Sequence, residues 1–564
     1  MTPETKICQN CKGDFIIEPD DFSFYEKMKV PAPTFCPTCR MQRRFMFRNE
    51  RNLYKGVCDL CHESMISIFN PENNYTVFCS KCWWSDSWDS GDYYLDYDSS
   101  KNFFEQLKDL QSKAPFMDKV VSYLTLINSA YINHASRCKN CYLIYDAANC
   151  ENVYHSNTVV GVRDSADCFM MNNTELSYGC IGGDGSRIYF SENCPSSVNV
   201  WYSKDCVGCT DCFGCVNLRN TSYHIYNEQY TKEEYDSKIS ELELDKYSNH
   251  LKIQEHIYDF WNKFPRKYMY GRMNDRATGE YVYSSKNAKN CYQSVLMEDS
   301  AYCQFITMPS FKDCYDISEW GNGAELCIEG VTIGEGVNNV KYCSGVWNNC
   351  HNVEYSMYTI NCTDCFGCIN LRKKQYCIFN KQYTKEEYFI LREKIIADLE
   401  KNPYIDEKGR IWKYGEFLPY DLSPFSYNES FATQYFPLTK KEIEDSGFKY
   451  IEPKKPEYKA TLEISGIPDS IHDVHDDFIK EILECNCGKF YRIVSGELQL
   501  LNRFDLPVPR ICPECRHDQR LARLSKPFLF DRNCDKCGLD IKTSYASDRP
   551  EIVYCEKCYL SAIV

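Results

Sequence analysis

The stretch DCVGCTDCFGCVNLR, residues 205–219, places four cysteines at intervals of three residues. A close copy, NCTDCFGCINLR, stands at residues 361–372. This spacing is compatible with an iron–sulfur cluster, a zinc site or one wall of a repeating β-structure. Each interpretation predicts a different kind of protein: one with an iron–sulfur cluster, one with a zinc site or one with a structural repeat. The sequence around the stretch discriminates among them.

The surrounding sequence repeats with a period of about 12 residues. In the second copy the repeated positions are Cys291, Cys303, Cys314, Cys327, a position near 340, Val353, Cys365 and Cys377. In the first copy they are Cys141, Val153, Cys168, Cys180, Val200, Cys212 and His224. Cysteine and valine exchange at these positions, as small buried residues do. Short apolar segments separated by turn-forming residues therefore predict a β-solenoid with stacked inward-facing side chains.

The positions of the four quoted cysteines agree with the 12-residue period, which favours the solenoid-wall interpretation. An iron–sulfur cluster prefers three closely spaced cysteines and a remote fourth, often followed by proline. No Cys-Pro follows this run, and Thr359 stands in the second copy where the first has Cys206. A zinc site remains an alternative. The residues whose metal binding stays open are Cys206, Cys209, Cys212 and Cys215, with Cys362, Cys365 and Cys368 in the second copy.

A longer duplication contains both copies. Residues 209–235 match residues 362–388 at a shift of 153, and both segments end in YTKEEY. Thr231 with Glu234, and Thr384 with Glu387, have the Thr-x-x-Glu spacing of a capping box. We therefore expect each solenoid unit to end in a helix that covers its open edge.

The two ends of the chain also repeat each other. Seven cysteines between Cys11 and Cys82 recur at a constant shift of 476, and Cys8 corresponds to Cys485 with a displacement of one residue. Paired cysteines at this spacing are typical of closed structural zinc sites, which have no open position for chemistry. We expect about four zinc ions per chain. The predicted ligands are Cys8, Cys11, Cys36 and Cys39; Cys58, Cys61, Cys79 and Cys82; Cys485, Cys487, Cys512 and Cys515; and Cys534, Cys537, Cys555 and Cys558.

Residues 6–45, KICQNCKGDFIIEPDDFSFYEKMKVPAPTFCPTCRMQRRF, resemble the probable zinc-ribbon (treble-clef) domain family. The C-x2-C pair, the DFSFY segment and the CPTCR ending carry the resemblance. Through CFGCVNLRN and PEIVYCEKCY, the whole chain is similar to large uncharacterised cysteine-rich proteins of environmental bacterial genomes. The resemblance implies zinc binding and this architecture, and it implies no particular reaction.

These patterns predict a mainly β multidomain chain, with zinc-ribbon or treble-clef modules at both ends flanking two helix-capped, short-period β-solenoid units. The expected parts are a tandem zinc-binding module (1–90), a helical linker (91–130), solenoid unit 1 (131–230), a helical cap and connector (231–287), solenoid unit 2 (288–383), a second helical cap (384–402), a connector (403–482) and a second tandem zinc-binding module (483–564).

Arginines follow the zinc knuckles. They are Arg40, Arg43, Arg44 and Arg48, and in the C-terminal copy Arg516, Arg520 and Arg523. Arginines beside aromatic residues can hold nucleic-acid phosphates and stack on bases. The formal charge of −15 argues against non-specific nucleic-acid binding by the chain as a whole. The interpretation that we favour is a helix whose arginines pair with the protein's own carboxylates.

We expect a non-enzymatic zinc-binding scaffold that presents surfaces to a protein partner or a second copy of the chain. RNA or DNA binding through the arginines is the alternative, and an iron–sulfur redox protein is a minor one. The sequence contains no catalytic-triad pattern and no HExxH motif. The chain has neither a run of 18 apolar residues nor a signal-peptide pattern, so we expect a cytoplasmic location without membrane contact.

Overall fold

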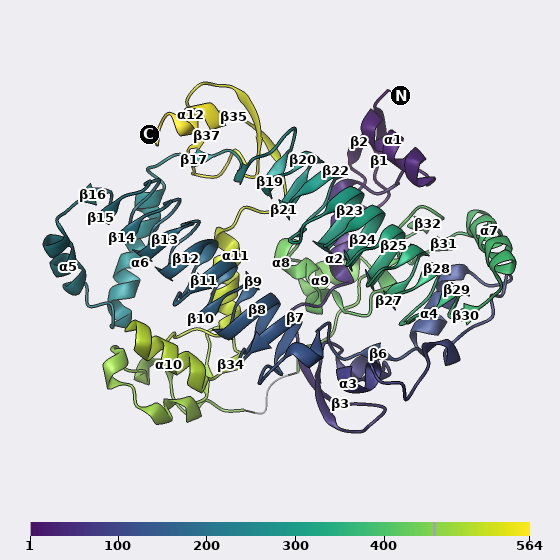
Figure 1. Cartoon of the computed structure of the whole chain (residues 1–564), viewed down its shortest axis with the longest axis horizontal. Helices are drawn as coiled ribbons and strands as arrows, with labels where there is room; N and C mark the ends of the chain where they lie inside the picture. Colours follow the sequence, from purple (N-terminus) through teal and green to yellow (C-terminus); the bar gives the residue numbers. More distant parts are fainter. Residues whose placement is uncertain (1, 455–457, 564) are drawn as a thin grey trace.

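The computed structural model describes residues 2–454 and 458–563. Two β-solenoids lie side by side, with helices and two-stranded hairpins packed between and around them (Figure 1). The first solenoid is a ten-stranded sheet, and the second combines a three-stranded and a ten-stranded sheet. The structure confirms the predicted class, a mainly β chain with duplicated solenoid units and cysteine clusters at both ends.

The strands of the first solenoid are β7 (Ile132–Lys139), β8 (Ile144–Tyr154), β9 (Asn157–Val160), β10 (Arg163–Ala166), β11 (Phe169–Glu175), β12 (Ile181–Tyr189), β13 (Ser197–Trp201), β14 (Thr210–Phe213), β15 (Ser222–Ile225) and β16 (Glu228–Gln229). Those of the second are β18 (Gly271–Arg272), β19 (Gly279–Tyr283), β20 (Lys286–Lys289), β21 (Cys291–Val295), β22 (Met297–Ala301), β23 (Phe311–Gly321), β24 (Ala324–Gly334), β25 (Asn338–Trp347), β26 (His351–Glu354), β27 (Met357–Ile360), β28 (Thr363–Phe366), β29 (Gln375–Ile378) and β30 (Lys381–Gln382).

The α-helices are α1 (Pro19–Met28), α2 (Pro37–Met46), α3 (Ser80–Trp83), α4 (Phe103–Gln111), α5 (Lys232–Ser240), α6 (Tyr247–Trp261), α7 (Lys385–Lys401), α8 (Ala432–Tyr435), α9 (Lys440–Asp445), α10 (Ser495–Phe504), α11 (Pro513–Arg523) and α12 (Glu556–Leu560). The remaining strands form short pairs: β1 (Glu4–Ile7) with β2 (Asp14–Ile17), β3 (Tyr54–Val57) with β4 (Ser64–Ser67), β5 (Val77–Phe78) with β6 (Phe116–Met117), β17 (Arg266–Lys267) with β37 (Val553–Tyr554), β31 (Tyr404–Ile405) with β32 (Ile411–Trp412), β33 (Leu483–Glu484) with β34 (Phe490–Tyr491), and β35 (Phe530–Asn533) with β36 (Asp540–Thr543). Among the described residues, no helix has the length and apolar character that a membrane crossing requires.

Neighbouring solenoid strands are parallel and offset by 12 residues, which confirms the predicted period. Ile132 of β7 pairs with Ile144 of β8, and Thr210 of β14 pairs with Ser222 of β15. In the middle of the second solenoid the offset widens to 13, as between Cys314 and its partner in β24. The repeated position that the sequence located only near residue 340 is Val340, which is buried.

Within a coil, the chain turns after every third residue. In the first solenoid the backbone φ angle is positive at Asn140, Leu143, Asp146 and Asn149. The residue that follows each turn faces inward and is buried: Cys141, Ile144, Ala147 and Cys150. A 12-residue coil therefore has four sides of three residues, with one inward side chain per side.

This geometry explains the quoted stretch. Positive φ angles occur at Asp205, Gly208, Asp211 and Gly214, each directly before a cysteine. The four inward positions of this coil are therefore filled by four buried cysteines: Cys206, Cys209, Cys212 and Cys215. The interval of three residues is the length of one side of the coil. The same rule holds in the second copy, where Asn361, Asp364 and Gly367 precede Cys362, Cys365 and Cys368.

The buried thiols find hydrogen-bond acceptors in the solenoid backbone. Cys303 Sγ donates to the carbonyl oxygens of Ala301 at 3.2 Å and Cys314 at 3.4 Å. Burial raises the pKa of both the Cys303 and the Cys314 thiols. These cysteines are protonated wall residues that fill a narrow interior.

Asparagine and aspartate are frequent at the turns because their side chains tolerate positive φ and bond to the neighbouring coil. Asn140 Nδ2 donates to Asn152 Oδ1 at 3.1 Å, and Asn152 Nδ2 donates to Asp164 Oδ1 at 2.7 Å. The second solenoid repeats the arrangement, with Asn287 Nδ2 donating to Asp299 Oδ1 at 2.8 Å. Ladders of side-chain hydrogen bonds thus hold the corners of successive coils in register.

Both predicted capping boxes are present. The side chain of Thr231 accepts from the backbone N–H of Glu234 at the start of α5, and Thr384 does the same with Glu387 at the start of α7. Before each helix, the final solenoid strand folds back into a short antiparallel pair. Each solenoid therefore ends in a reversal followed by a helix, which protects the last strand edge.

We expect Cys303→Val to preserve the fold. The replacement is small and apolar, as its inward counterpart Val153 is, and it leaves no buried polar group without a partner. The cost should be about 1–2 kcal/mol from the change of shape, measured by denaturant unfolding. Cys303→Asp, which places a carboxyl group in the same dry interior, serves as the contrast and should cost more. Equal losses in the two variants would contradict the wall interpretation.

Candidate metal centres and the arginine clusters behind them

The predicted ligands come together in four sets of four. In each set, the four Sγ atoms all lie within 4.8 Å of one another. The sets are Cys8, Cys11, Cys36 and Cys39; Cys58, Cys61, Cys79 and Cys82; Cys485, Cys487, Cys512 and Cys515; and Cys534, Cys537, Cys555 and Cys558. Across the part of the chain that the structure describes, only these four groups of potential metal ligands gather, and none includes a solenoid cysteine.

All four sets have the same construction. The first two cysteines lie in the turn of a hairpin: β1–β2, β3–β4, β33–β34 or β35–β36. The third is the N-cap of a helix and the fourth lies in its first turn. The N-caps are Cys36 of α2, Cys79 of α3, Cys512 of α11 and Cys555 of α12. Pro37 and Pro513 occupy the first helical position, where proline costs no hydrogen bond.

The sulfur spacing fits a tetrahedral metal. A metal–sulfur distance of about 2.3 Å, as for zinc, places tetrahedral thiolates about 3.8 Å apart. The Sγ–Sγ distance is 3.8 Å from Cys11 to Cys36 and 3.9 Å from Cys61 to Cys79. In the C-terminal module it is 3.7 Å between Cys487 and Cys512, and 3.8 Å in the last set. The four cages are therefore of the right size for a thiolate-bound ion.

Backbone N–H groups support the negative charge of one sulfur in every set. The N–H of the third cysteine donates to the Sγ of the first, at 3.2 Å for Cys36 to Cys8 and for Cys555 to Cys534. Burial alone raises the pKa of Cys534, but backbone N–H donors outweigh it and bring the pKa to about 6. The equivalent balance brings the pKa of Cys58 and Cys485 to about 7. A lowered pKa favours the thiolate form that metals bind.

His62 is a turn residue. It follows the second cysteine of its hairpin with a φ angle of 61° and donates its backbone N–H to the carbonyl of Cys58. Lys12, Gly488 and Gly538 occupy the same position in the other three sets, also with positive φ. His62 therefore occupies a turn position, and its imidazole is not among the clustered ligand atoms.

The arginines of α2 lie behind the first metal set, buried against the second solenoid. Arg40 Nη2 pairs with Asp316 Oδ2 at 2.8 Å, and Arg44 Nη1 with Asp316 Oδ1 at 2.9 Å. Arg43 Nη2 pairs with Glu329 Oε2 at 2.7 Å. Arg40 is 2% exposed and the other two are completely buried.

Arg48 follows α2 and is buried as well. It pairs with Glu50 at 3.0 Å and with Glu319. Asp316 and Glu319 lie in β23 and Glu329 in β24, whereas Glu50 lies two residues after Arg48. The helix is thereby attached to the solenoid by charge as well as by apolar packing.

The arginines of α11 make the equivalent contacts with the first solenoid. Arg516 Nη1 lies 2.7 Å from Asp167 Oδ2 and 2.8 Å from Glu497 Oε1, and Arg520 Nη2 lies 2.9 Å from Asp167 Oδ1. The pKa of Glu497 falls to about 2, because the charges of Arg516 and His155 outweigh the effect of burial. Arg523 is partly exposed and pairs with Glu192 at 3.1 Å.

The two clusters are related by the internal repeat. Arg40 and Arg44 correspond to Arg516 and Arg520 at the shift of 476, and each pair holds one aspartate at a positive-φ corner of a solenoid. The connection is crossed: α2 of the N-terminal module packs on the second solenoid, and α11 of the C-terminal module packs on the first. Figure 1 shows α2 beside β23 and β24, and α11 beside β11.

This burial corrects the nucleic-acid interpretation of the arginine stretches. Arg40, Arg43, Arg44, Arg48, Arg516 and Arg520 are buried and paired with the chain's own carboxylates, so they are not available to phosphates. Arg523 is the partly exposed exception, and it is also paired. The structure therefore favours the helix-packing interpretation. The sequence analysis did not identify Asp167 and Asp316 as the partners, since aspartate is common at the solenoid corners.

No family model and no curated protein matches the chain. Among solved structures, the chain is similar to a "putative acetyltransferase" from Desulfovibrio desulfuricans G20. The two are 11% identical, and the alignment covers 51% of this chain and 86% of that chain with a TM-score of 0.09. A TM-score this low carries no argument about fold or activity.

We expect Asp316→Ala to be strongly destabilising, because it leaves Arg40 and Arg44 buried without their carboxylate. Breaking a buried pair in this way typically costs about 3–5 kcal/mol. Asp313→Ala is the matched control: Asp313 also has positive φ, but its partner Lys27 is 49% exposed. The control should lose no more than about 1 kcal/mol. Denaturant unfolding of both variants tests the difference, and similar losses would show that the buried pairs do not hold α2.

Proposed function

We propose that this chain is a non-enzymatic zinc-binding scaffold that presents surfaces to a protein partner or to a second copy of itself. The observation that carries the proposal is the set of four all-cysteine cages. In each cage the chain's own thiolates fill all four positions of a tetrahedral ion, so no position remains for a substrate. Metal binding of this kind stabilises structure.

Zinc is the metal that this donor set favours. Four thiolates in tetrahedral geometry suit zinc or a single iron, and zinc needs no redox partner. The order of hairpin, knuckle and helix supports membership of the zinc-ribbon or treble-clef class. A reducing compartment such as the cytoplasm would keep the sixteen cage cysteines and the twenty solenoid cysteines as thiols.

Exposed apolar side chains on the metal-binding hairpins support a role in protein contacts. In the β1–β2 hairpin, Ile7 is 68% and Ile16 is 53% exposed, and the strand register places both on one face. Val57 of β3 and Leu539 beside β36 are also more than half exposed. Apolar residues on a hairpin that a metal cage holds rigid would lose little conformational entropy on binding.

We expect about four zinc ions per chain after anaerobic purification, measured by elemental analysis. Cys36→Ser should lower the content to about three and unfold the first module, because a structural site contributes about 10–16 kcal/mol of apparent binding energy. The matched control, Cys303→Ser in the solenoid, should keep the full content. A content of one ion or less in the parent would contradict the proposal. Absorbance near 400 nm would indicate an iron–sulfur protein instead.

We expect Ile7→Asp with Ile16→Asp to weaken association with the partner that co-purifies with the parent, or self-association. Size-exclusion chromatography with light scattering measures the mass of the assembly. The control is Lys6→Asp, which changes charge on the same strand but on the opposite face of the hairpin, beside Phe15. Zinc content should be unchanged in both variants. If the unmodified protein remains a monomer with no bound partner after gentle purification, the scaffold role is contradicted.

A further inference from the structure

A cavity of about 620 Å³ lies where the two solenoids and the C-terminal module meet. Strands β9, β11 and β12 of the first solenoid and the turns that follow β12 and β13 form one wall, and β18, β19 and β21 of the second form the opposite wall. Arg523, Tyr545 and Tyr559 of the C-terminal module complete the lining. This volume lies within the range of small-molecule sites, about 300–1,000 Å³.

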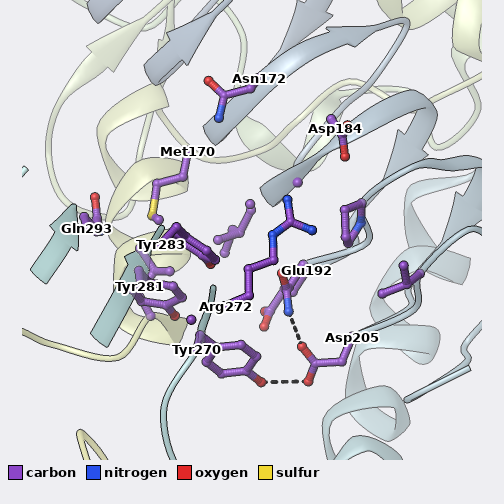
Figure 2. Close-up of a pocket in the computed structure, with 18 of the residues that line it drawn as sticks. Met170, Asn172, Asp184, Glu192, Asp205, Tyr270, Arg272, Tyr281, Tyr283 and Gln293 are labelled. Carbon is purple, nitrogen blue, oxygen red and sulfur yellow. Dashed lines mark hydrogen bonds between the residues drawn. The ribbon is translucent and has the colours of Figure 1, made fainter. Parts of the chain in front are cut away.

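The acidic side chains at the base of the cavity are already neutralised. Glu192 pairs with Lys204 at 2.5 Å and with Arg523 at 3.1 Å. Asp205 accepts hydrogen bonds from the Tyr270 hydroxyl at 2.7 Å and from Asn193 Nδ2 at 2.6 Å (Figure 2). Asp205 also lies 3.7 Å from Arg266 Nη1, so Glu192 and Asp205 both have a cationic partner. Asp184, at the rim, accepts from the backbone N–H of Ser196.

Two guanidinium groups that line the cavity have no carboxylate partner within residues 2–454 and 458–563. The Arg272 side chain, on β18, makes no hydrogen bond or ion pair there; it is exposed to solvent and extends into the cavity (Figure 2). Arg219 donates Nη1 only to main-chain oxygens, those of Leu218 and Asp205. Unpaired guanidinium groups offer planar pairs of donors that match phosphate oxygens.

Aromatic rings and one unpaired acceptor also line the cavity. Tyr283 is the strand partner of Arg272, and Tyr281 stacks on Tyr270 with ring centroids 5.6 Å apart. Gln293 is only 5% exposed, yet its Oε1 has no hydrogen-bond partner within the described residues, while its Nε2 donates to the Tyr292 hydroxyl. A buried acceptor in a cavity wall is costly unless a ligand or water donates to it.

We propose that this cavity binds a nucleotide. Arg272 and Arg219 would hold the phosphate, the half-buried Tyr283 beside Arg272 would stack on the base, and Gln293 Oε1 would accept a hydrogen bond from an N–H group of the base edge. Base–aromatic stacking is worth about 1–3 kcal/mol. A neutral sugar would leave both guanidinium groups unused, and a bare phosphate would leave the tyrosines and Gln293 unused. The proposal does not rest on the scaffold function.

Isothermal titration of the intact metal-loaded chain with AMP, GMP, CMP and UMP tests the proposal, with adenosine and inorganic phosphate as separate arms. At least one nucleotide should bind at least tenfold more tightly than adenosine or phosphate, a difference of about 1.4 kcal/mol. Arg272→Ala should weaken that binding tenfold or more. The control is Arg276→Ala, because Arg276 lies four residues further on, is 69% exposed and does not line the cavity.

Gln293→Leu, which keeps the side-chain volume, should weaken nucleotide binding and leave phosphate binding unchanged. Unchanged metal content and circular dichroism show that each variant is folded. The absence of binding by every nucleotide at about 1 mM overturns the proposal. Phosphate binding as tight as nucleotide binding overturns the base-recognition part. Equal affinities of the Arg272 and Arg276 variants overturn the assignment of the site.

Discussion

The buried pairing of α2 and α11 arginines with solenoid aspartates is the contact on which the arrangement of this chain depends. Each helix begins at a metal-ligand cysteine and, about one turn later, buries guanidinium groups against a carboxylate at a solenoid corner. A buried guanidinium without its carboxylate is costly, so the pairing tolerates little displacement. The metal cages, the two solenoids and the cavity between them are held in one geometry by these contacts.

The crossed connection has a mechanical consequence. Helix α2 attaches the N-terminal module to the second solenoid and α11 attaches the C-terminal module to the first, so each solenoid is held by a segment remote in sequence. A chain connected in this way cannot separate into an N-terminal and a C-terminal half without exposing charged groups from both interfaces. The nucleotide cavity forms at a junction where walls from both solenoids and the C-terminal module face one another.

The solenoid backbone follows a regular geometry, but it places few steric requirements on the side chains that point inward. One side chain per three residues points inward, and the interior admits cysteine, valine, alanine, serine or isoleucine. Cysteine is common there because it is small, apolar and able to donate to a nearby carbonyl. Among the described residues, cysteines gather into potential metal sites only where a hairpin and a helix bring four sulfurs together.

The features that arise from local spacing could be predicted from the residues alone: the 12-residue period, the capping boxes at Thr231 and Thr384, and the four cysteine sets. These follow from short-range geometry, which a pattern of residues reports directly. The role of the arginines emerges from the folded chain, because Arg40 and Asp316 are 276 residues apart and nothing local links them. The same is true of the cavity, because Arg272 and Gln293 line it only when the first solenoid lies opposite them. Contacts between distant surfaces depend on how whole units pack, and that information is spread over many residues at once.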